Sequence, residues 1–314
     1  MKLIESYYEI IPQAPGLEGI YKNIEIAARN CYKSESFIKE GSAEKMVDAL
    51  IKRGHGSPLE HGTVYLKISH TSPIADRNYM KSMDAIVFYK RNKYSKIVKR
   101  TEDHFHHDVY ITSNYRTLVE NNRLDDLQYL CEPTEYHEKR YTVRFVCSRS
   151  ISHEIVRHRV MSFCQESQRY VNYSLDKFGN DITCIVPKKI KDVINDLADT
   201  YDPIEQTKRD WLVNMPLEEA IKDYGIVLDD GIMCWYKSLE RDEADYMYLV
   251  NTCKWRPEQA RGVLPNDCKT DIIMTGFASD WKHFFELRTS NTAHEDVRDL
   301  ACPLEMEFKF SDYI

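Results

Sequence analysis

The sequence predicts an α+β fold in which helices flank a mixed or antiparallel sheet. Segments with apolar residues at helical spacing are interspersed with short alternating segments typical of strands. Of the 314 residues, 42 % are hydrophobic and 30 % are charged, as in globular proteins with a sizeable core. We expect one domain over residues 1–314, with an inserted segment at about 80–138.

In the first half, "GSAEKMVDALIKRGHGSP" (41–58) predicts a helix that Ser42 caps and that Gly54 and Gly56 end. "TVYLKIS" (63–69) alternates apolar and polar residues and predicts a half-buried strand. The segment from about 80 to 138 is rich in Lys, Arg, Asn, Asp and Tyr, so we expect short elements there and little regular structure.

The second half predicts strands at 140–147 and 182–187, and either a strand or a buried helical turn at 270–276. A helix is expected at 150–160 with Ser152 as a candidate cap, and mostly helical structure at 203–251. "RPEQARGVLP" (256–265) predicts a short helix between two prolines. Further helices are expected at 280–288 and 292–301, the latter capped by Thr292.

Composition excludes several classes of protein. The net charge is −7, so bulk electrostatics does not favour binding to a polyanion. The nine cysteines include no C-x-x-C pair, which indicates reduced thiols and a cytoplasmic location. The N-terminal residues contain no long apolar core and no apolar run approaches the ~20 residues of a spanning helix, so neither a secretory signal nor a membrane segment is expected.

Residues 157–170, "RHRVMSFCQESQRY", combine arginines, serines and carboxamides with a few apolar residues. Consecutive helical side chains diverge by about 100°, so Arg157 and Arg159 at a helix end would point to different sides. Hydroxyl groups, backbone N–H groups and guanidinium groups together can bind a phosphate. Spacing alone leaves open a charged helix tip followed by a polar loop.

Two other polar segments invite functional readings. "EDHFHHD" (102–108) contains residue types that bind metals, but its spacing matches no helical histidine pair, so we expect solvated surface and no metal site. "KRNKYSKIVKR" (90–100) is basic around Tyr94 and is compatible with RNA, a partner, a folate tail or a neighbouring subunit.

The spacing Arg157-His158-Arg159, seven residues, Ser167, then Arg169-Tyr170 resembles the signature of the flavin-dependent thymidylate synthases. Four further blocks resemble that family in the same order. They are "AARNCYKS" (27–34), "GHGSPLEHGTVYLKI" (54–68), "EQARGVLP" (258–265) and "MTGFASDWKHFFELRTSNTAHEDVRDLA" (274–301).

The resemblance implies methylation of dUMP to dTMP with 5,10-methylenetetrahydrofolate as carbon donor and with NADPH, through bound FAD, as reductant. It also implies a homotetramer with active sites at subunit interfaces. Arg288 is the implied catalytic residue, because a permanent cation at the pyrimidine edge can stabilise developing negative charge.

The implied dUMP-binding residues are Glu154, Arg157, Gln165, Glu166, Ser167, Gln168, Arg169, Arg261 and Arg288, with Arg261 and Arg288 coming from another subunit. The implied flavin-binding residues are His61, Thr63, Arg157, His158, Arg159, Gln165, Phe277, Ser279 and His283. Phe277 and Ser279 depart from the Asn and Arg that many members carry, so His283 and backbone groups are expected to contribute more. Gln165 stands where some members have Glu.

No enzymic nucleophile is needed if a flavin supplies the reducing power. Cys164 near His and Arg side chains stays an alternative nucleophile. Ser167 lacks the Gly-x-Ser-x-Gly elbow and is better interpreted as a hydrogen-bond donor. The rival function is nucleic-acid binding through Arg157–Arg159 and the basic segment 90–100; the acidic composition and the lack of a known nucleic-acid-binding motif oppose it.

Overall fold

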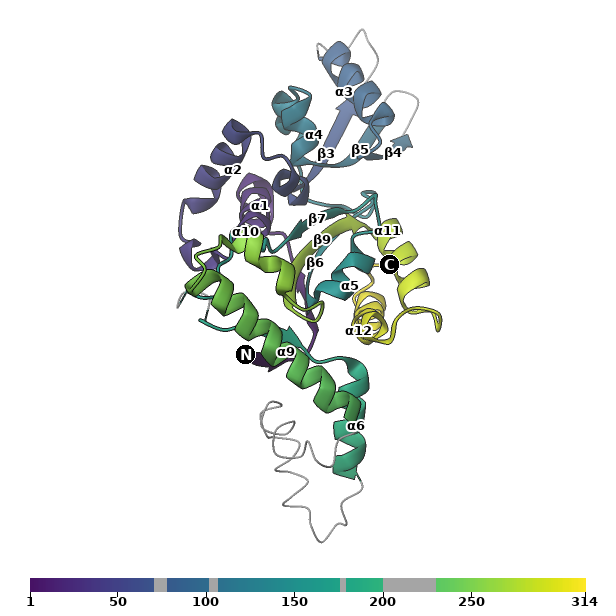
Figure 1. Cartoon of the computed structure of the whole chain (residues 1–314). Helices are drawn as coiled ribbons and strands as arrows, with labels where there is room; N and C mark the ends of the chain where they lie inside the picture. Colours follow the sequence, from purple (N-terminus) through teal and green to yellow (C-terminus); the bar gives the residue numbers. More distant parts are fainter. Residues whose placement is uncertain (71–77, 102–106, 176–178, 200–229) are drawn as a thin grey trace.

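The computed structural model describes residues 1–70, 78–101, 107–175, 179–199 and 230–314. Helices and mainly antiparallel sheets combine in an α+β fold, which confirms the predicted class (Figure 1). The strands are β1 (Lys2–Ile4), β2 (Tyr7–Ile11), β3 (Thr63–His70), β4 (Lys96–Thr101), β5 (His107–Asn114), β6 (Arg140–Ser148), β7 (Ser162–Gln165), β8 (Thr183–Ile185) and β9 (Lys269–Phe277). The α-helices are α1 (Gly16–Tyr32), α2 (Ser42–Arg53), α3 (Tyr79–Arg91), α4 (Tyr115–Glu120), α5 (Arg149–Ile155), α6 (Lys188–Asp199), α9 (Asp230–Asn251), α10 (Pro257–Ala260), α11 (Ala278–Arg288) and α12 (Glu295–Phe310). Short 3₁₀ helices are η1 (Glu35–Phe37), η2 (Ser57–His61), η3 (Leu124–Tyr129) and η6 (Arg261–Val263).

A four-stranded antiparallel sheet in the order β2-β6-β9-β7 lies at the centre. The segment 270–276, open between strand and helix in the sequence, is therefore part of strand β9. Alternate residues of β9 face opposite sides, as strand geometry requires. Ile272 and Met274 pack among the residues of α11 and α12, whereas Ile273 packs with Ala27 of α1.

Helices cover both faces of this sheet. Helices α5, α11 and α12 lie to its right in Figure 1 and α1 lies to its left. On the first face Trp281, Phe284 and Phe285 are essentially fully buried. Burial of large aromatic side chains contributes about 2–3 kcal/mol each, so α11 is firmly fixed on the sheet. This fixes the direction of Arg288, the last residue of that helix.

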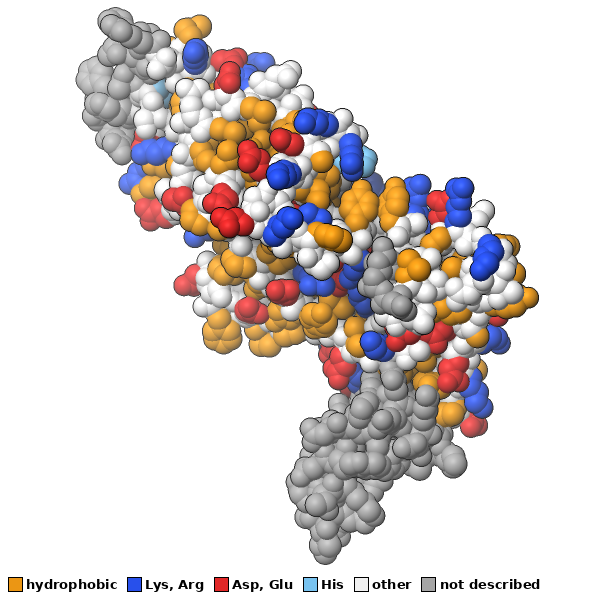
Figure 2. Space-filling view, turned by 90° about the vertical axis from the view of Figure 1, so that its left-hand side faces the viewer, with side chains coloured by type: hydrophobic (Ala, Val, Ile, Leu, Met, Phe, Trp, Pro, Cys, Tyr) orange, Lys and Arg blue, Asp and Glu red, His pale blue; other side chains and the backbone are white. Residues whose placement is uncertain are grey.

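Figure 2 shows the face that carries α1 and α2. Lys and Arg side chains are interspersed there with Asp and Glu, and hydrophobic side chains gather in patches between them. No single sign of charge dominates the described part of this face.

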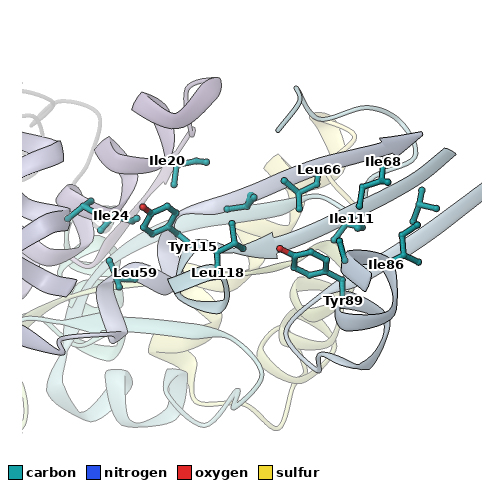
Figure 3. Packing of buried hydrophobic residues seen from close by; sticks show 14 of the residues in the cluster. Ile20, Ile24, Leu59, Leu66, Ile68, Ile86, Tyr89, Ile111, Tyr115 and Leu118 are labelled. Carbon is teal, nitrogen blue, oxygen red and sulfur yellow. The ribbon is translucent and has the colours of Figure 1, made fainter. Parts of the chain in front are cut away.

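A second antiparallel sheet has the order β3-β5-β4, with helices α3 and α4 and the N-terminal helices α1 and α2 around it. The alternating burial of β3 agrees with the predicted half-buried strand. Its core includes Ile20, Leu66, Ile111 and Tyr115, which Figure 3 shows packed together. Segment 80–138 is more regular than predicted, because β5 is the central strand of this sheet and is almost entirely buried. Whether the segment is an insertion stays a prediction.

The third layer is a two-stranded parallel pair, β1-β8, covered by the long helix α9. Ile232, Tyr236 and Leu239 of α9 are buried against this pair. The described part of the predicted helical region 203–251 is thus helical from residue 230, and residues 203–229 lie outside the described residues.

Three predicted helix caps are wrong. Gly41, in the left-handed conformation, is the N-cap of α2, and Ser42 is the first helical residue. Ser148, not Ser152, caps α5 by accepting a hydrogen bond from the Ile151 N–H group, and the helix ends at Ile155 rather than near residue 160. His294 rather than Thr292 caps α12, because its Nδ1 accepts from the Asp296 N–H group. For α5 and α12 another residue within four positions accepts from a free N–H group, whereas α2 has no side-chain cap.

Other predicted helix boundaries are confirmed in part, because α12 continues past residue 301 to Phe310 and α10 ends at Ala260, before Pro265. Gly54 ends α2 in the left-handed conformation, and Pro257 begins α10. In the parts of the chain that the structure describes, no helix is both long enough and apolar enough to cross a membrane.

Candidate active site

The Arg157–Arg159 segment forms a turn directly after α5. The His158 N–H group donates to the Ile155 carbonyl over 3.3 Å and the Met161 N–H group donates to the His158 carbonyl over 3.0 Å. This turn buries His158 and leaves Arg157 and Arg159 exposed. No acidic residue in the described ranges forms an ion pair with either exposed guanidinium group. Two such cations are available for an anionic ligand.

Arg288 is held in a fixed orientation beside this turn. Its Nη1 and Nη2 donate to Glu154 Oε2 and to the Glu154 carbonyl, both over 2.7 Å. Its Nε donates to His158 Nε2 over 3.0 Å. Three directions of the planar guanidinium fork are therefore used, which a lysine could not reproduce.

His158 must be neutral to accept this hydrogen bond. Burial, the Arg288 guanidinium and the nearby His283 lower the pKa of His158 to about 4. The imidazole is therefore uncharged at neutral pH and acts as an acceptor for Arg288.

Two cavities meet at Arg157 and Arg288. One is open, with a volume of about 670 Å³, and is lined by Ser150, His153, Glu154, Arg157, Asn266, Arg288, Thr292, Ala293 and His294. The other, of about 190 Å³, is lined by Arg157, His158, Arg159, Val160, Met161, Asp280, His283, Leu287 and Arg288. Arg157 lines both cavities and Arg159 lines the second, so the two side chains meet at the smaller cavity rather than lying on separate sides of a helix end.

The segment 165–169 follows β7 and forms a second group. Gln165 Nε2 donates to Ser152 Oγ over 2.8 Å and to Thr270 Oγ1 over 3.2 Å. The Ser167 N–H group donates to the Cys31 carbonyl, and Ser167 Oγ accepts from the Arg169 N–H group. Arg169 is exposed, whereas Glu166 is buried.

Gln168 is half-buried in the same segment, and its Nε2 lies 3.7 Å from Cys268 Sγ. Ser167 and Arg169 are not among the described residues that line the two cavities of the same chain. Arg261, at the start of η6, is exposed and is also absent from both linings.

A third group surrounds Arg140, which sequence reasoning missed. Its Nη1 donates to the Glu60 carbonyl and Thr63 Oγ1, over 3.1 and 3.4 Å, and its Nη2 donates to Ser162 Oγ over 3.3 Å. Its guanidinium carbon lies 5.5 Å from the centre of the Phe277 ring. Arg140 is the first residue of a predicted strand, and its positive charge at that position was the only sign in the sequence that it could belong to the site.

The remaining predicted flavin-binding residues differ in exposure. His61 is completely buried, with Nδ1 2.8 Å from Thr275 Oγ1, so it reaches no surface of this chain. Phe277 is buried, whereas Ser279 is exposed and its hydroxyl donates to Glu138. His283 is exposed on α11 and lines the smaller cavity.

Comparison with known proteins identifies the family. The family model described as thymidylate synthase complementing protein matches residues 17–132 and 78–309, which together make up most of the chain. The chain belongs to the thymidylate synthase complementing protein family. The matched residues of this family include the turn at Arg157–Arg159, the segment 165–169 and helix α11.

Several curated relatives are named flavin-dependent thymidylate synthase. The relative from Geobacter sulfurreducens is 30 % identical over 154 residues, which are 49 % of this chain and 49 % of that protein. The relative from Pyrococcus furiosus is 29 % identical over 168 residues, 54 % of this chain and 53 % of that protein. The relative from Clostridium tetani is 31 % identical over 163 residues, 52 % of this chain and 55 % of that protein. The chain thus spans about half the length of the curated relatives it matches.

The structure argues against Cys164 as a catalytic thiol. Cys164 is 3 % exposed, and the adjacent Cys31 thiol and burial raise the pKa of Cys164 well above its ordinary value. A protonated, enclosed thiol is a poor nucleophile. Cys164 instead packs with Ala27 and Ile273 between α1 and the sheet.

Cys164→Ala should therefore retain most of the turnover of the unmodified protein. The lost sulfur should lower the free energy of unfolding by about 1 kcal/mol, since a small core group is removed. Turnover and urea unfolding of the two proteins would be compared directly. Complete loss of turnover with unchanged ligand binding would identify Cys164 as a chemical participant.

The metal interpretation of segment 102–108 gains no support. His107 and Asp108 lie in β5, where Asp108 accepts hydrogen bonds from Ser69 and Tyr110 and pairs with Lys67. The other residues, 102–106, lie outside the described residues. Among the described side chains, no group of three or more potential ligands could hold a metal ion.

Proposed function

We propose that this chain is a flavin-dependent thymidylate synthase, which methylates dUMP to dTMP. In this proposal 5,10-methylenetetrahydrofolate donates the carbon and NADPH, through FAD, supplies the reducing equivalents. The observation that carries the proposal is the Arg288 fork, fixed by Glu154 and His158. Beside it lie Arg157 and Arg159, which are exposed and form no ion pair with any described acidic residue. The family and the names of the relatives support it.

The residues around the smaller cavity, of about 190 Å³, could hold part of a flavin dinucleotide. Val160, Met161 and Leu287 provide apolar surface, and Arg157 and Arg159 provide charge for a diphosphate. His283 adds a polar group, as the sequence predicts. When bound, the flavin would supply the hydride that reduces the transferred carbon. Near Phe277, where many members have Asn, the cations Arg140 and Lys96 lie 5.5 Å from the ring centre and could replace missing donors.

Within this proposal the protein binds and polarises dUMP rather than attacking it. Arg288 would face the pyrimidine edge, where its fixed guanidinium stabilises the negative charge that grows as the ring is activated. Arg157, Ser167 and Arg169 would bind the phosphate through charge and hydroxyl groups. Neutral His158 and Glu154 would keep Arg288 in the productive orientation.

We further propose a homotetramer with sites shared between subunits. Arg288 and Arg157 line the cavities of one chain, whereas Ser167, Arg169 and Arg261 are outside those linings. If all of them bind one dUMP molecule, a second copy must bring the missing residues to the cavity. The free state of all nine cysteines supports a cytoplasmic location.

FAD should accordingly bind tightly only to the assembled oligomer. Size-exclusion chromatography that records flavin absorbance at decreasing protein concentrations would measure this. The flavin signal should leave the protein as the oligomer dissociates. Monomers that retain flavin would contradict a shared site.

The proposed function is tested by assaying dTMP formation from dUMP with FAD, NADPH and 5,10-methylenetetrahydrofolate, and then omitting each component in turn. With protein first freed of bound flavin, every omission should abolish dTMP formation. A colourless protein that forms no dTMP but shifts DNA in a gel would favour the rival nucleic-acid-binding function. The mixed charges of the face in Figure 2 offer little support for that rival.

A further inference from the structure

A buried ion cluster lies directly beneath the segment Ser167–Arg169. It consists of Lys33, Arg144, Glu166, Lys269 and Asp271. The side chains of Glu166 and Asp271 are only 2 % and 0 % exposed. Lys269 Nζ lies 3.0 Å from Glu166 Oε2 and 2.7 Å from Asp271 Oδ2, and Lys33 Nζ contacts the same two carboxylates.

The cluster joins segments that are far apart in the sequence. Lys33 follows α1, Glu166 follows β7, and Lys269 and Asp271 belong to β9. Arg144 of β6 adds a contact, with Nη2 3.2 Å from Asp271 Oδ1. Tyr173, beyond the segment, donates to Glu166 Oε1 over 3.2 Å.

Backbone hydrogen bonds tie the segment to the same place. The Glu166 N–H group donates to the Asp271 carbonyl over 2.8 Å, and the Ser167 N–H group donates to the Cys31 carbonyl over 3.1 Å. Asn30 Nδ2 donates to the carbonyls of Cys164 and Asp271, over 3.1 Å each. Backbone hydrogen bonds thus fix Glu166 to β9 and the adjacent Ser167 to the end of α1.

Burying this ion cluster costs free energy of folding. Removing charges from water costs several kcal/mol per ion, and an apolar core of similar volume is often at least as stable. Lys33 also adopts the left-handed conformation, with φ 48° and ψ 56°, which is uncommon for a residue with a side chain. Burial and the neighbouring Lys269 lower the pKa of Lys33 to about 8. Stability alone gives no reason for such a cluster below a polar segment that presents the exposed Arg169.

We infer that Glu166, with Lys33, Lys269 and Asp271, is a positioning group that holds Ser167 and Arg169 in place for the phosphate of the nucleotide. Glu166 itself then makes no contact with substrate, although it lies within the segment predicted to bind dUMP. The inference rests on the proposed function for the identity of the ligand, but the rigidity of the segment can be measured without any ligand.

The test compares Glu166→Gln with the unmodified oligomer by two measurements. Without ligand, hydrogen–deuterium exchange of the backbone amides of residues 166–171 should become faster in the variant. The affinity for dUMP should fall on the order of 10²-fold, because a displaced Arg169 and Ser167 would lose their charge-assisted hydrogen bonds to the phosphate. The kcat at saturating dUMP should change by less than about threefold, since the reacting groups are untouched. Glu18→Gln, which breaks an exposed ion pair with Lys22, is the matched control and should change none of these.

Lys33 provides a second pair of variants in case Glu166→Gln does not fold. Lys33→Arg keeps a cation between the two carboxylates and should retain slow exchange, whereas Lys33→Met should not. Unchanged exchange and unchanged dUMP affinity in folded Glu166→Gln, or equal exchange in the two Lys33 variants, would overturn the inference. If the unmodified protein fails to bind dUMP while the exchange results follow expectation, the proposed function fails and the positioning role of the cluster stands.

Discussion

Arg288→Lys should lower kcat for dTMP formation by about 10²–10³-fold, the loss typical of removing one donor to developing negative charge. Lysine keeps the charge but not the planar fork whose Nη1, Nη2 and Nε bind Glu154 and His158. The charge on the ring grows only in the transition state, so dUMP binding in the ground state should weaken far less. Flavin reoxidation at saturating dUMP and titration of dUMP would measure the two effects separately.

Arg169→Ala is the contrasting variant. The phosphate has the same charge in the ground and transition states, so the loss of exposed Arg169 should chiefly raise KM. If Arg288→Lys abolished binding while Arg169→Ala only slowed turnover, the two roles would be reversed and the proposed placement of dUMP would be wrong.

The free energy of unfolding should decrease as the pH falls from 7 to 5. Burial and the nearby Arg140 lower the pKa of His61 from 6.5 to about 3, and the pKa of His158 is lowered to about 4. Between these values and 6.5 the unfolded chain takes up protons that the folded protein does not, so protonation favours unfolding. The loss should be about 2 kcal/mol for each histidine at pH 5.

Urea unfolding of the unmodified protein and of His61→Asn, each at pH 7 and pH 5, would measure this loss. Asparagine can still contact Thr275 Oγ1 but does not titrate, so the variant should be less sensitive to pH. His55→Asn, at an exposed position, is the control. Equal pH dependence in all three proteins would rule out His61 as the source.

The sequence was informative where local periodicity determines structure. The alternation of β3 and the helical spacing of α2 identified both elements, because each depends on residues close in the chain. The caps were harder to predict, since Ser148 and Ser152 both offer a hydroxyl and only the backbone conformation chooses between them. Segment 80–138 was misjudged because charged residues on the edge strand β4 hid the buried strand β5 beside it.

In the candidate site, too, contacts between residues far apart in the sequence could not be predicted from local patterns. The resemblance predicted that Arg288 reaches the site of Arg157 from another subunit, whereas the structure places Arg288 beside Arg157 and His158 of the same chain. Nothing in the sequence indicated that Glu166 forms ion pairs with Lys33 and Lys269, because both lysines lie more than a hundred residues away along the chain. Asp271, an acid directly before the apolar residues 272–274 of β9, was a hint of a buried ion pair.

The position of β9 at the centre of the main sheet has a consequence for biosynthesis. The three-stranded sheet is complete once residue 114 has been made, but β6 must wait for β9 until residue 277. Roughly 120 residues separate the end of β6 from the start of β9, which corresponds to roughly 6–24 s at ribosomal speed. During that interval one edge of β6 has no β9 to pair with and is open to contacts with other chains. The strand that precedes α11 and its Arg288 is thus also the one that ends this period of exposure.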